Sequence, residues 1–184
     1  MDLPPSSFFM FKRFFVAALV LSPMAGAEPP PEFPVLAEFG GNYWVETNQP
    51  LPADTQFKVA FDVGDGAEPG KLNYNIHSLA RFLNMHVRHG VARDNIQLAL
   101  VVHGKATKDL LTNAHYQQEF GTDNGSEALI QALLNNNTQV YVCGQSANHY
   151  GVTQDKLIDG VQISLSAMTQ HALLQQQGYT LNPF

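Results

Sequence analysis

Three short polar motifs carry the residues of this chain that are best suited to chemistry. They are Asp65-Gly66, His103-Gly104-Lys105 and Cys143-Gly144-Gln145-Ser146, and each follows an apolar run. A cysteine thiol can act as a nucleophile, and an imidazole can move the protons of such a reaction. Cys143 is the only cysteine in the sequence, so it has no internal disulfide partner. A single unpaired cysteine indicates either an intermolecular disulfide or a reactive thiol.

The glycines after His103 and Cys143 suit sharp strand-to-helix turns. Such turns need permissive dihedral angles, and they aim the next backbone amides at the crevice. Amides at a helix start stabilise a thiolate, which lowers the pKa of the thiol. We therefore predict a site with catalytic Cys143 and His103, and with these substrate-binding residues: Asp65, Gly104, Lys105, Gly144, Gln145 and Ser146.

Each of these residues also has a purely structural interpretation. Cys143 could be a small buried residue that ends a strand, as free cysteines often are. His103 could simply hydrogen-bond a neighbouring loop. Lys105 and Asp65 could be solvated charges.

Strand and helix patterns alternate through most of the chain. Residues 57–63, 96–102, 140–142 and 161–165 are β-rich or apolar runs that predict strands. Helices are predicted from Ile76 to Gly90, from Lys105 to Leu111, from Asn124 onward with Glu127 in a capping box, and from Ala167 to Gln177 with Gly178 as its cap. This order predicts an α/β fold with a mostly parallel sheet covered on both faces. In such sheets the ligand crevice lies at the carboxyl ends of the strands, where all three polar motifs fall.

The first residues are typical of a secretory signal peptide. Lys12-Arg13 precede an apolar run, and Ala25-Gly26-Ala27 supplies small residues for cleavage. We predict a cleaved signal peptide over residues 1–27, hence a periplasmic or secreted protein, with an uncleaved N-terminal anchor as the alternative. A proline-rich extended arm is predicted over 28–56, and one α/β domain over 57–184.

Charge and motifs limit the partners and cofactors. Without residues 1–27 the chain has 8 basic and 15 acidic residues, which argues against nucleic acid and against anionic membranes. Phosphate-loop, dinucleotide and serine-hydrolase signatures are missing from the sequence, so we expect no cofactor. The pairs His86 with His89 and Cys143 with His149 do not complete a metal site, and we predict no metal.

Four segments together resemble the DsrE/DsrF-like family. They are Phe57–Val63, Val101–Gly104, Val140–Ser146 and Leu165–Thr169, and the segment with Cys143 is the most specific of them. The exported, single-cysteine members are the most similar, since they share the proline-rich arm. The resemblance implies a flavodoxin-like three-layer sandwich with a five-stranded, mostly parallel sheet, assembled as a homotrimer or homohexamer. Cys143 matches the cysteine that carries sulfur as a persulfide in intracellular members of the family.

Three classes of function follow from these observations. The first is a sulfur carrier or sulfurtransferase-like protein, in which Cys143 accepts sulfur from a small-molecule or protein donor and passes it to an acceptor. The second is a non-catalytic module that binds a small anion, a thiol or a metal ion in the same crevice. The third is an oligomeric scaffold.

Overall fold

The computed structural model describes residues 33–182 together with Met1. The predicted signal peptide, apart from Met1, and residues 28–32 of the predicted arm lie outside this part of the chain. Among the described residues, no helix combines the length and the apolar character that a membrane span requires.

A five-stranded sheet in the order β4-β3-β2-β1-β5 forms the centre of the domain. Its strands are β1 (Phe57–Val63), β2 (Ile96–Val102), β3 (Gln139–Cys143), β4 (Gln162–Ser164) and β5 (Thr180–Asn182). Every pairing between neighbours is parallel, so the predicted α/β fold is confirmed. β1 and β2 have the predicted bounds, whereas the residues themselves gave no sign of β5, because a three-residue edge strand leaves almost no periodic pattern.

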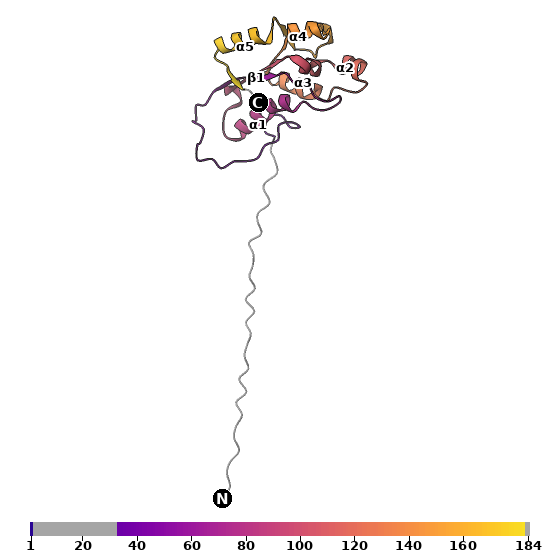
Figure 1. Ribbon diagram of the computed structural model, residues 1–184. Helices are drawn as coiled ribbons and strands as arrows, with labels where there is room; N and C mark the ends of the chain where they lie inside the picture. The colour runs from indigo at the N-terminus through magenta and orange to yellow at the C-terminus, as the bar shows by residue number, and fades with distance from the viewer. Residues whose placement is uncertain (2–32, 183–184) are drawn as a thin grey trace.

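Helices connect the strands and cover both faces of the sheet. They are α1 (Tyr74–Arg88), α2 (Asn113–Phe120), α3 (Glu127–Asn135), α4 (Gly144–His149) and α5 (Ala167–Gln176), with short 3₁₀ helices at Arg93–Asn95, Gly104–Leu110 and Gln154–Lys156. Figure 1 shows α5 and α1 on opposite sides of β1. The domain is therefore a three-layer α/β sandwich.

The pleat of the strands divides the apolar side chains between two cores. Val59, Phe61 and Val63 point to the face that α1 and α3 cover, in the larger core. Ala60 points to the opposite face, where it packs with Leu174 of α5 in a smaller core. Because successive strand residues alternate between the faces, Asp62 projects to the α5 side of the sheet.

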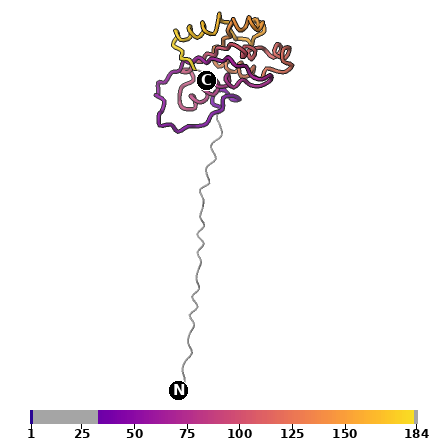
Figure 2. The backbone as a smooth tube through the Cα atoms, viewed as in Figure 1, coloured from indigo at the N-terminus to yellow at the C-terminus, as the bar shows by residue number. Residues whose placement is uncertain are grey.

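The described part of the arm packs on α1 of its own domain through a buried asparagine. Asn84 is fully buried in the middle of α1. Its amide nitrogen donates to the carbonyl oxygens of Leu36, Phe39 and Gly40, and its oxygen accepts from the amides of Val35 and Leu36. Figure 2 shows this segment as a long loop beside the domain. One polar side chain thus satisfies a stretch of arm backbone that forms no helix.

Two predictions about local structure were wrong in detail. The predicted capping box at Asn124 does not form: Ser126 is the N-cap of α3, and the Asn124 oxygen accepts from the Ser126 amide instead. Glu127 accepts a hydrogen bond from the Asn113 amide rather than from a cap residue. The predicted helix over residues 105–111 is a 3₁₀ helix over Gly104–Leu110.

Replacing Asn84 with alanine should release the arm. The substitution removes five hydrogen bonds to the arm backbone, and a buried group left unsatisfied costs about 1–3 kcal/mol. The Gly40 carbonyl keeps its hydrogen bond from the side-chain amide of Asn42. Because part of the arm can regain hydrogen bonds to water, we expect unfolding to become easier by about 2–3 kcal/mol in urea titrations. Proteolysis within residues 35–56 should also become faster.

Asn135→Ala is the matched control, because Asn135 is an exposed residue of α3. Equal stability losses for the two variants would contradict the role assigned to Asn84.

Candidate functional site

The ends of β1, β2 and β3 bring three reactive side chains to one face of the sheet. Val102 pairs with Val142 in register, so His103 and Cys143, the next residues, leave neighbouring strands at the same level. Neighbouring strands lie about 4.8 Å apart. Asp62 precedes Val63, which pairs with Val102, and it projects to the same face. Asp62, His103 and Cys143 therefore meet beneath α5.

One cavity of about 370 Å³ holds these three side chains. His103 and Cys143, predicted as catalytic, both line it, together with Gln145 and Ser146. The other lining residues are Asp62 and four residues at the start of α5, namely Ser166, Ala167, Met168 and His171.

The thiol of Cys143 lies where the first turns of two helices converge. Cys143 is 6% exposed and precedes α4, while Ala167 begins α5. Burial acts to raise the pKa of the thiol, but the backbone amides of Ser146 and Ala167, the Ser146 hydroxyl and the Gln145 amide outweigh it, so the pKa lies below its ordinary value. The Cys143 side chain makes no capping hydrogen bond to α4. The dipoles of the nearby amides therefore stabilise the thiolate.

Ser146 connects the surroundings of the thiol to the end of β2. The Ser146 hydroxyl oxygen accepts a hydrogen bond from the Gly104 amide at 3.0 Å. With that acceptor position occupied, the hydroxyl proton is free to point at the sulfur of Cys143, whose pKa it lowers. Ser146 thereby links the loop after His103 to the thiolate.

The two predicted glycines are required for different reasons. Gly104 has a φ of +53°, a left-handed conformation that most side chains disfavour, as predicted for a sharp turn. Gly144 has no positive φ, so the expectation of an unusual dihedral angle there was wrong. A Cβ at Gly144 would instead lie 2.5 Å from the carbonyl oxygen of Ser164. Its missing side chain allows β4 to approach the residue after the thiol.

A carboxylate bridges two histidines in the same cavity. Asp62 Oδ2 lies 3.1 Å from His103 Nε2, and Asp62 Oδ1 lies 2.7 Å from His171 Nε2. Partial burial acts to raise the pKa of Asp62, but hydrogen bonds from His103 and His171 and the charges of these imidazoles outweigh it, so the pKa is lowered. The carboxylate is therefore ionised at neutral pH and holds both rings.

Lys105 and Asp65 lie in a neighbouring cavity rather than beside the thiol. That cavity, of about 600 Å³, shares Asp62 and His103 with the Cys143 cavity and also contains Gly104. Both charged side chains are exposed. The predicted substrate-binding residues are thus divided, with Gln145 and Ser146 at the sulfur and Asp65, Gly104 and Lys105 on the far side of His103.

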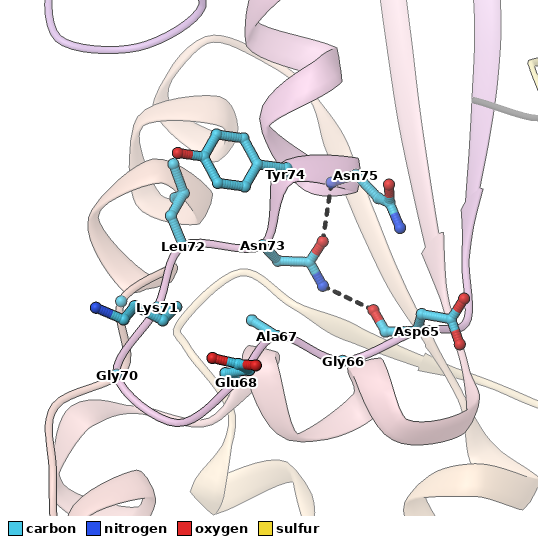
Figure 3. A pocket seen from close by; sticks show the side chains of 11 residues that line it. Asp65, Gly66, Ala67, Glu68, Gly70, Lys71, Leu72, Asn73, Tyr74 and Asn75 are labelled. Atoms are coloured by element: carbon cyan, nitrogen blue, oxygen red, sulfur yellow. Dashed lines mark hydrogen bonds between the residues drawn. The ribbon is translucent and has the colours of Figure 1, made fainter.

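A larger cavity of about 780 Å³ lies along the start of α1, beyond Asp65. Figure 3 shows Asn73 at its centre, where the side-chain amide donates to the Asp65 carbonyl and the side-chain oxygen accepts from the Asn75 amide. Its lining contains neither cysteine nor histidine. Its polar contacts belong to the cap of α1, and the thiol cavity remains the candidate for chemistry.

Metal-binding geometry is missing from the described residues, which contain no group of three or more His, Cys, Asp or Glu side chains arranged for a metal ion. The Nδ1 atoms of His86 and His89 instead form hydrogen bonds with the carbonyl oxygens of Phe82 and Met85. His149 packs against Tyr150 and does not line the Cys143 cavity.

Comparison with known proteins identifies the family. Residues 58–183 match the DsrE/DsrF-like family. The chain belongs to this family. Since the match spans most of the chain and includes the segment with Cys143, it agrees with the resemblance seen in the sequence. No curated protein sequence matches the chain.

Two solved structures are similar to this DsrE/DsrF-like protein. One is a protein of unknown function, MTH1491, from Methanobacterium thermoautotrophicum, with a TM-score of 0.52, 12% identity, and coverage of 70% of this chain and all of the other. The second is the ychN protein from E. coli, with a TM-score of 0.49, 20% identity and the same coverage. At these identities the first likeness supports the shared fold and nothing further.

Asp62 and His171 are the site residues that the sequence interpretation missed. Asp62 was counted only as part of a β-rich run, although a charged residue just before the end of a buried strand is itself a signal. His171 follows Ala167 by four residues, so both lie on one face of α5. That spacing becomes informative only once α5 is known to cover the thiol.

Replacing Ser146 with alanine should raise the pKa of Cys143. The variant loses the hydroxyl that stabilises the thiolate, so less thiolate is present at neutral pH and alkylation becomes slower there. The rate of iodoacetamide alkylation, measured against pH, should give a lower apparent pKa for the unchanged protein than for Ser146→Ala.

Ser164→Ala is the control, because the Ser164 hydroxyl donates to the carbonyl oxygens of Val142 and Ser166 and not to the sulfur. A profile of Ser146→Ala that coincides with the unchanged protein would show that the hydroxyl does not act on the thiolate.

Proposed function

We propose that this protein accepts and carries sulfane sulfur as a persulfide on Cys143. The supporting observation is the environment of the thiol: a thiolate stabilised by amides from two helix starts, at the wall of a cavity that also holds imidazoles. A thiolate is the reactive form of cysteine, and a nearby imidazole can move the protons. Membership of the DsrE/DsrF-like family makes sulfur relay the expected chemistry.

The cavity suits a small sulfur compound or the end of an exposed side chain of a donor or acceptor protein. Its volume of about 370 Å³ is small, and Met168, 81% exposed, stands at its wall. The outer sulfur of a persulfide carries negative charge, which the amides of Gln145, Ser146 and Ala167 can stabilise as they stabilise the thiolate.

Export of the protein is part of this proposal. The charged residues, apolar run and Ala25-Gly26-Ala27 near the start of the sequence support a cleaved signal peptide. A periplasmic or secreted carrier would receive its sulfur from a donor outside the cytoplasm. Expression of the full-length gene should give a protein in the periplasmic fraction whose mass lacks residues 1–27, and this measurement checks the location.

Polysulfide treatment of the purified native protein should add sulfur to Cys143. Mass spectrometry should show a gain of one or more sulfur atoms that disappears after reduction, because the thiolate attacks the sulfane sulfur and keeps it. Cys143→Ser should gain none. If the native protein takes up no sulfur while the urea-unfolded protein does, the thiol is inaccessible, and a binding module that uses the same cavity replaces the carrier.

We also propose that the protein forms a trimer or hexamer through the surface beside the cavity. Large apolar side chains of β4, of the connection after it and of the start of α5 are exposed, namely Ile163, Leu165 and Met168. Exposed apolar groups of this size that lie close together along the chain favour association.

Light scattering on the mature protein should therefore show a trimer or larger species at micromolar concentration. Leu165→Asp should lower the mass, since a charge in an apolar contact is costly. Leu181→Asp, which alters an exposed leucine on the opposite edge strand, is the control. A monomer before any substitution excludes the assembly.

A further inference from the structure

Asp62 joins two imidazoles that come from different layers of the fold. His103 follows β2, and His171 lies on α5, which covers that face of the sheet. Their Nε2 atoms lie 3.1 and 2.7 Å from the two separate oxygens of Asp62. The His171 side chain is 14% exposed and that of His103 is 37% exposed. The more accessible imidazole is thus the one at the level of Cys143.

The carboxylate fixes which nitrogen of each ring carries a proton. An ionised carboxylate only accepts hydrogen bonds, so both Nε2 atoms must donate to Asp62. In a neutral ring the Nδ1 atom is then unprotonated, and in an imidazolium Nδ1 carries the mobile proton. Nδ1 of His171 is buried and has no hydrogen-bond partner within the described structure. His103 remains as the imidazole that can exchange a proton with a molecule bound in the cavity.

The ring of His103 is also held by the backbone beneath it. A Cβ on Gly64 would lie 2.6 Å from His103 Cε1, so the imidazole packs directly on that glycine. Contacts from Asp62 on one side and from Gly64 on another leave the ring little freedom. A fixed ring is what a proton-transfer group needs, because such transfer requires hydrogen-bond reach.

The groups around the sulfur of Cys143 stabilise its thiolate. They do not supply a proton to the thiolate that leaves the sulfur donor. The amides of Ser146, Ala167 and Gln145 are far too weakly acidic to give up a proton, and so is the Ser146 hydroxyl. A basic alkyl thiolate leaves more slowly than a weakly basic one, so a proton donated as it departs can accelerate the step. An imidazolium at the same cavity can provide that proton.

We propose that His103 donates the proton to the thiolate that leaves when Cys143 receives sulfur, and that Asp62 and His171 are positioning residues that hold His103 in place. This inference rests on the proposed function. Asp62 fixes the tautomer and orientation of His103, and His171 anchors the second oxygen of Asp62, so that the carboxylate cannot turn away.

The step balances without a further reagent. The thiolate of Cys143 attacks the outer sulfur of a donor persulfide, R–S–SH, and a bond forms between the two sulfurs. The R–S to S bond breaks, and its electron pair stays on R–S⁻. The proton of the His103 imidazolium passes to R–S⁻ and gives R–SH. Cys143 is oxidised to the persulfide level while the donor is reduced to a thiol.

Two disulfide probes that differ in their leaving groups test the proton transfer. Bis(2-hydroxyethyl) disulfide releases a basic alkyl thiolate, whereas 5,5′-dithiobis(2-nitrobenzoate) releases a weakly basic aryl thiolate that needs no proton. Asp62→Asn is the main variant, since an amide can donate to Nε2 of His103 and thereby favour the wrong tautomer. We expect it to slow the alkyl probe by roughly ten- to a hundredfold, while the aryl probe changes less than about threefold.

Two histidine variants separate proton donation from positioning. His103→Gln can still donate an amide hydrogen bond to Asp62, but it carries no transferable proton, so it should show the same selective loss. His171→Gln keeps a donor to Asp62 and should lose less. His115→Gln, on α2 and outside the Cys143 cavity, is the matched control and should leave the ratio of the two rates unchanged.

Iodoacetamide alkylation provides a check on folding, because iodide leaves without a proton. Asp62→Asn and His103→Gln should be alkylated at nearly the unchanged rate. If Asp62→Asn does not fold, His103→Gln decides the question alone. Equal losses with the alkyl and aryl probes, or no loss with either, would overturn the proton-donor role.

The test also distinguishes this inference from the proposed function. Failure of the native protein to form a persulfide, together with a selective loss of the alkyl probe in both variants, would refute sulfur carriage and leave His103 as a proton donor in disulfide exchange at Cys143. Persulfide formation with an unchanged ratio of probe rates would refute the proton donor and leave the carrier in place.

Discussion

The parallel register of β1, β2 and β3 is the constraint on which the site depends. Because the three strands run in one direction and pair without a bulge, their carboxyl ends meet at one edge of the sheet. The side chains of Asp62, His103 and Cys143 then fall on one face by the alternation of the pleat. A shift of a single residue in any of these pairings would turn one side chain to the opposite face and dismantle the site.

Burial and hydrogen bonding act against each other at the sulfur, and the arrangement of the helices determines the result. A thiol that is 6% exposed is disfavoured as an anion by desolvation alone. The first amides of α4 and α5 reverse this preference because both helices begin next to Cys143. Ser166 caps α5 by accepting from the Thr169 amide, which leaves the Ala167 amide available to the sulfur. A site of this kind needs both helix starts, since α4 alone is short.

Sequence patterns were informative wherever periodicity and strand ends carried the signal. The apolar runs at 57–63 and 96–102 defined the bounds of β1 and β2, and parallel strand order predicted that His103 and Cys143 would share an edge. They could not place Asp62 or His171, because the distance between β1 and α5 along the chain hides their contact. They also placed Lys105 and Asp65 at the same edge without showing that His103 separates them from the thiol.

The anchoring of the arm by Asn84 has a practical consequence for attaching the protein to a tag or a solid support. The chain reaches the domain over the outer side of α1, whereas the Cys143 cavity opens on the face covered by α5. The two sides are separated by the full thickness of the sheet. An affinity handle or a solid support joined at Phe33 is therefore attached on the α1 side of the sheet, opposite the face that carries the reactive thiol.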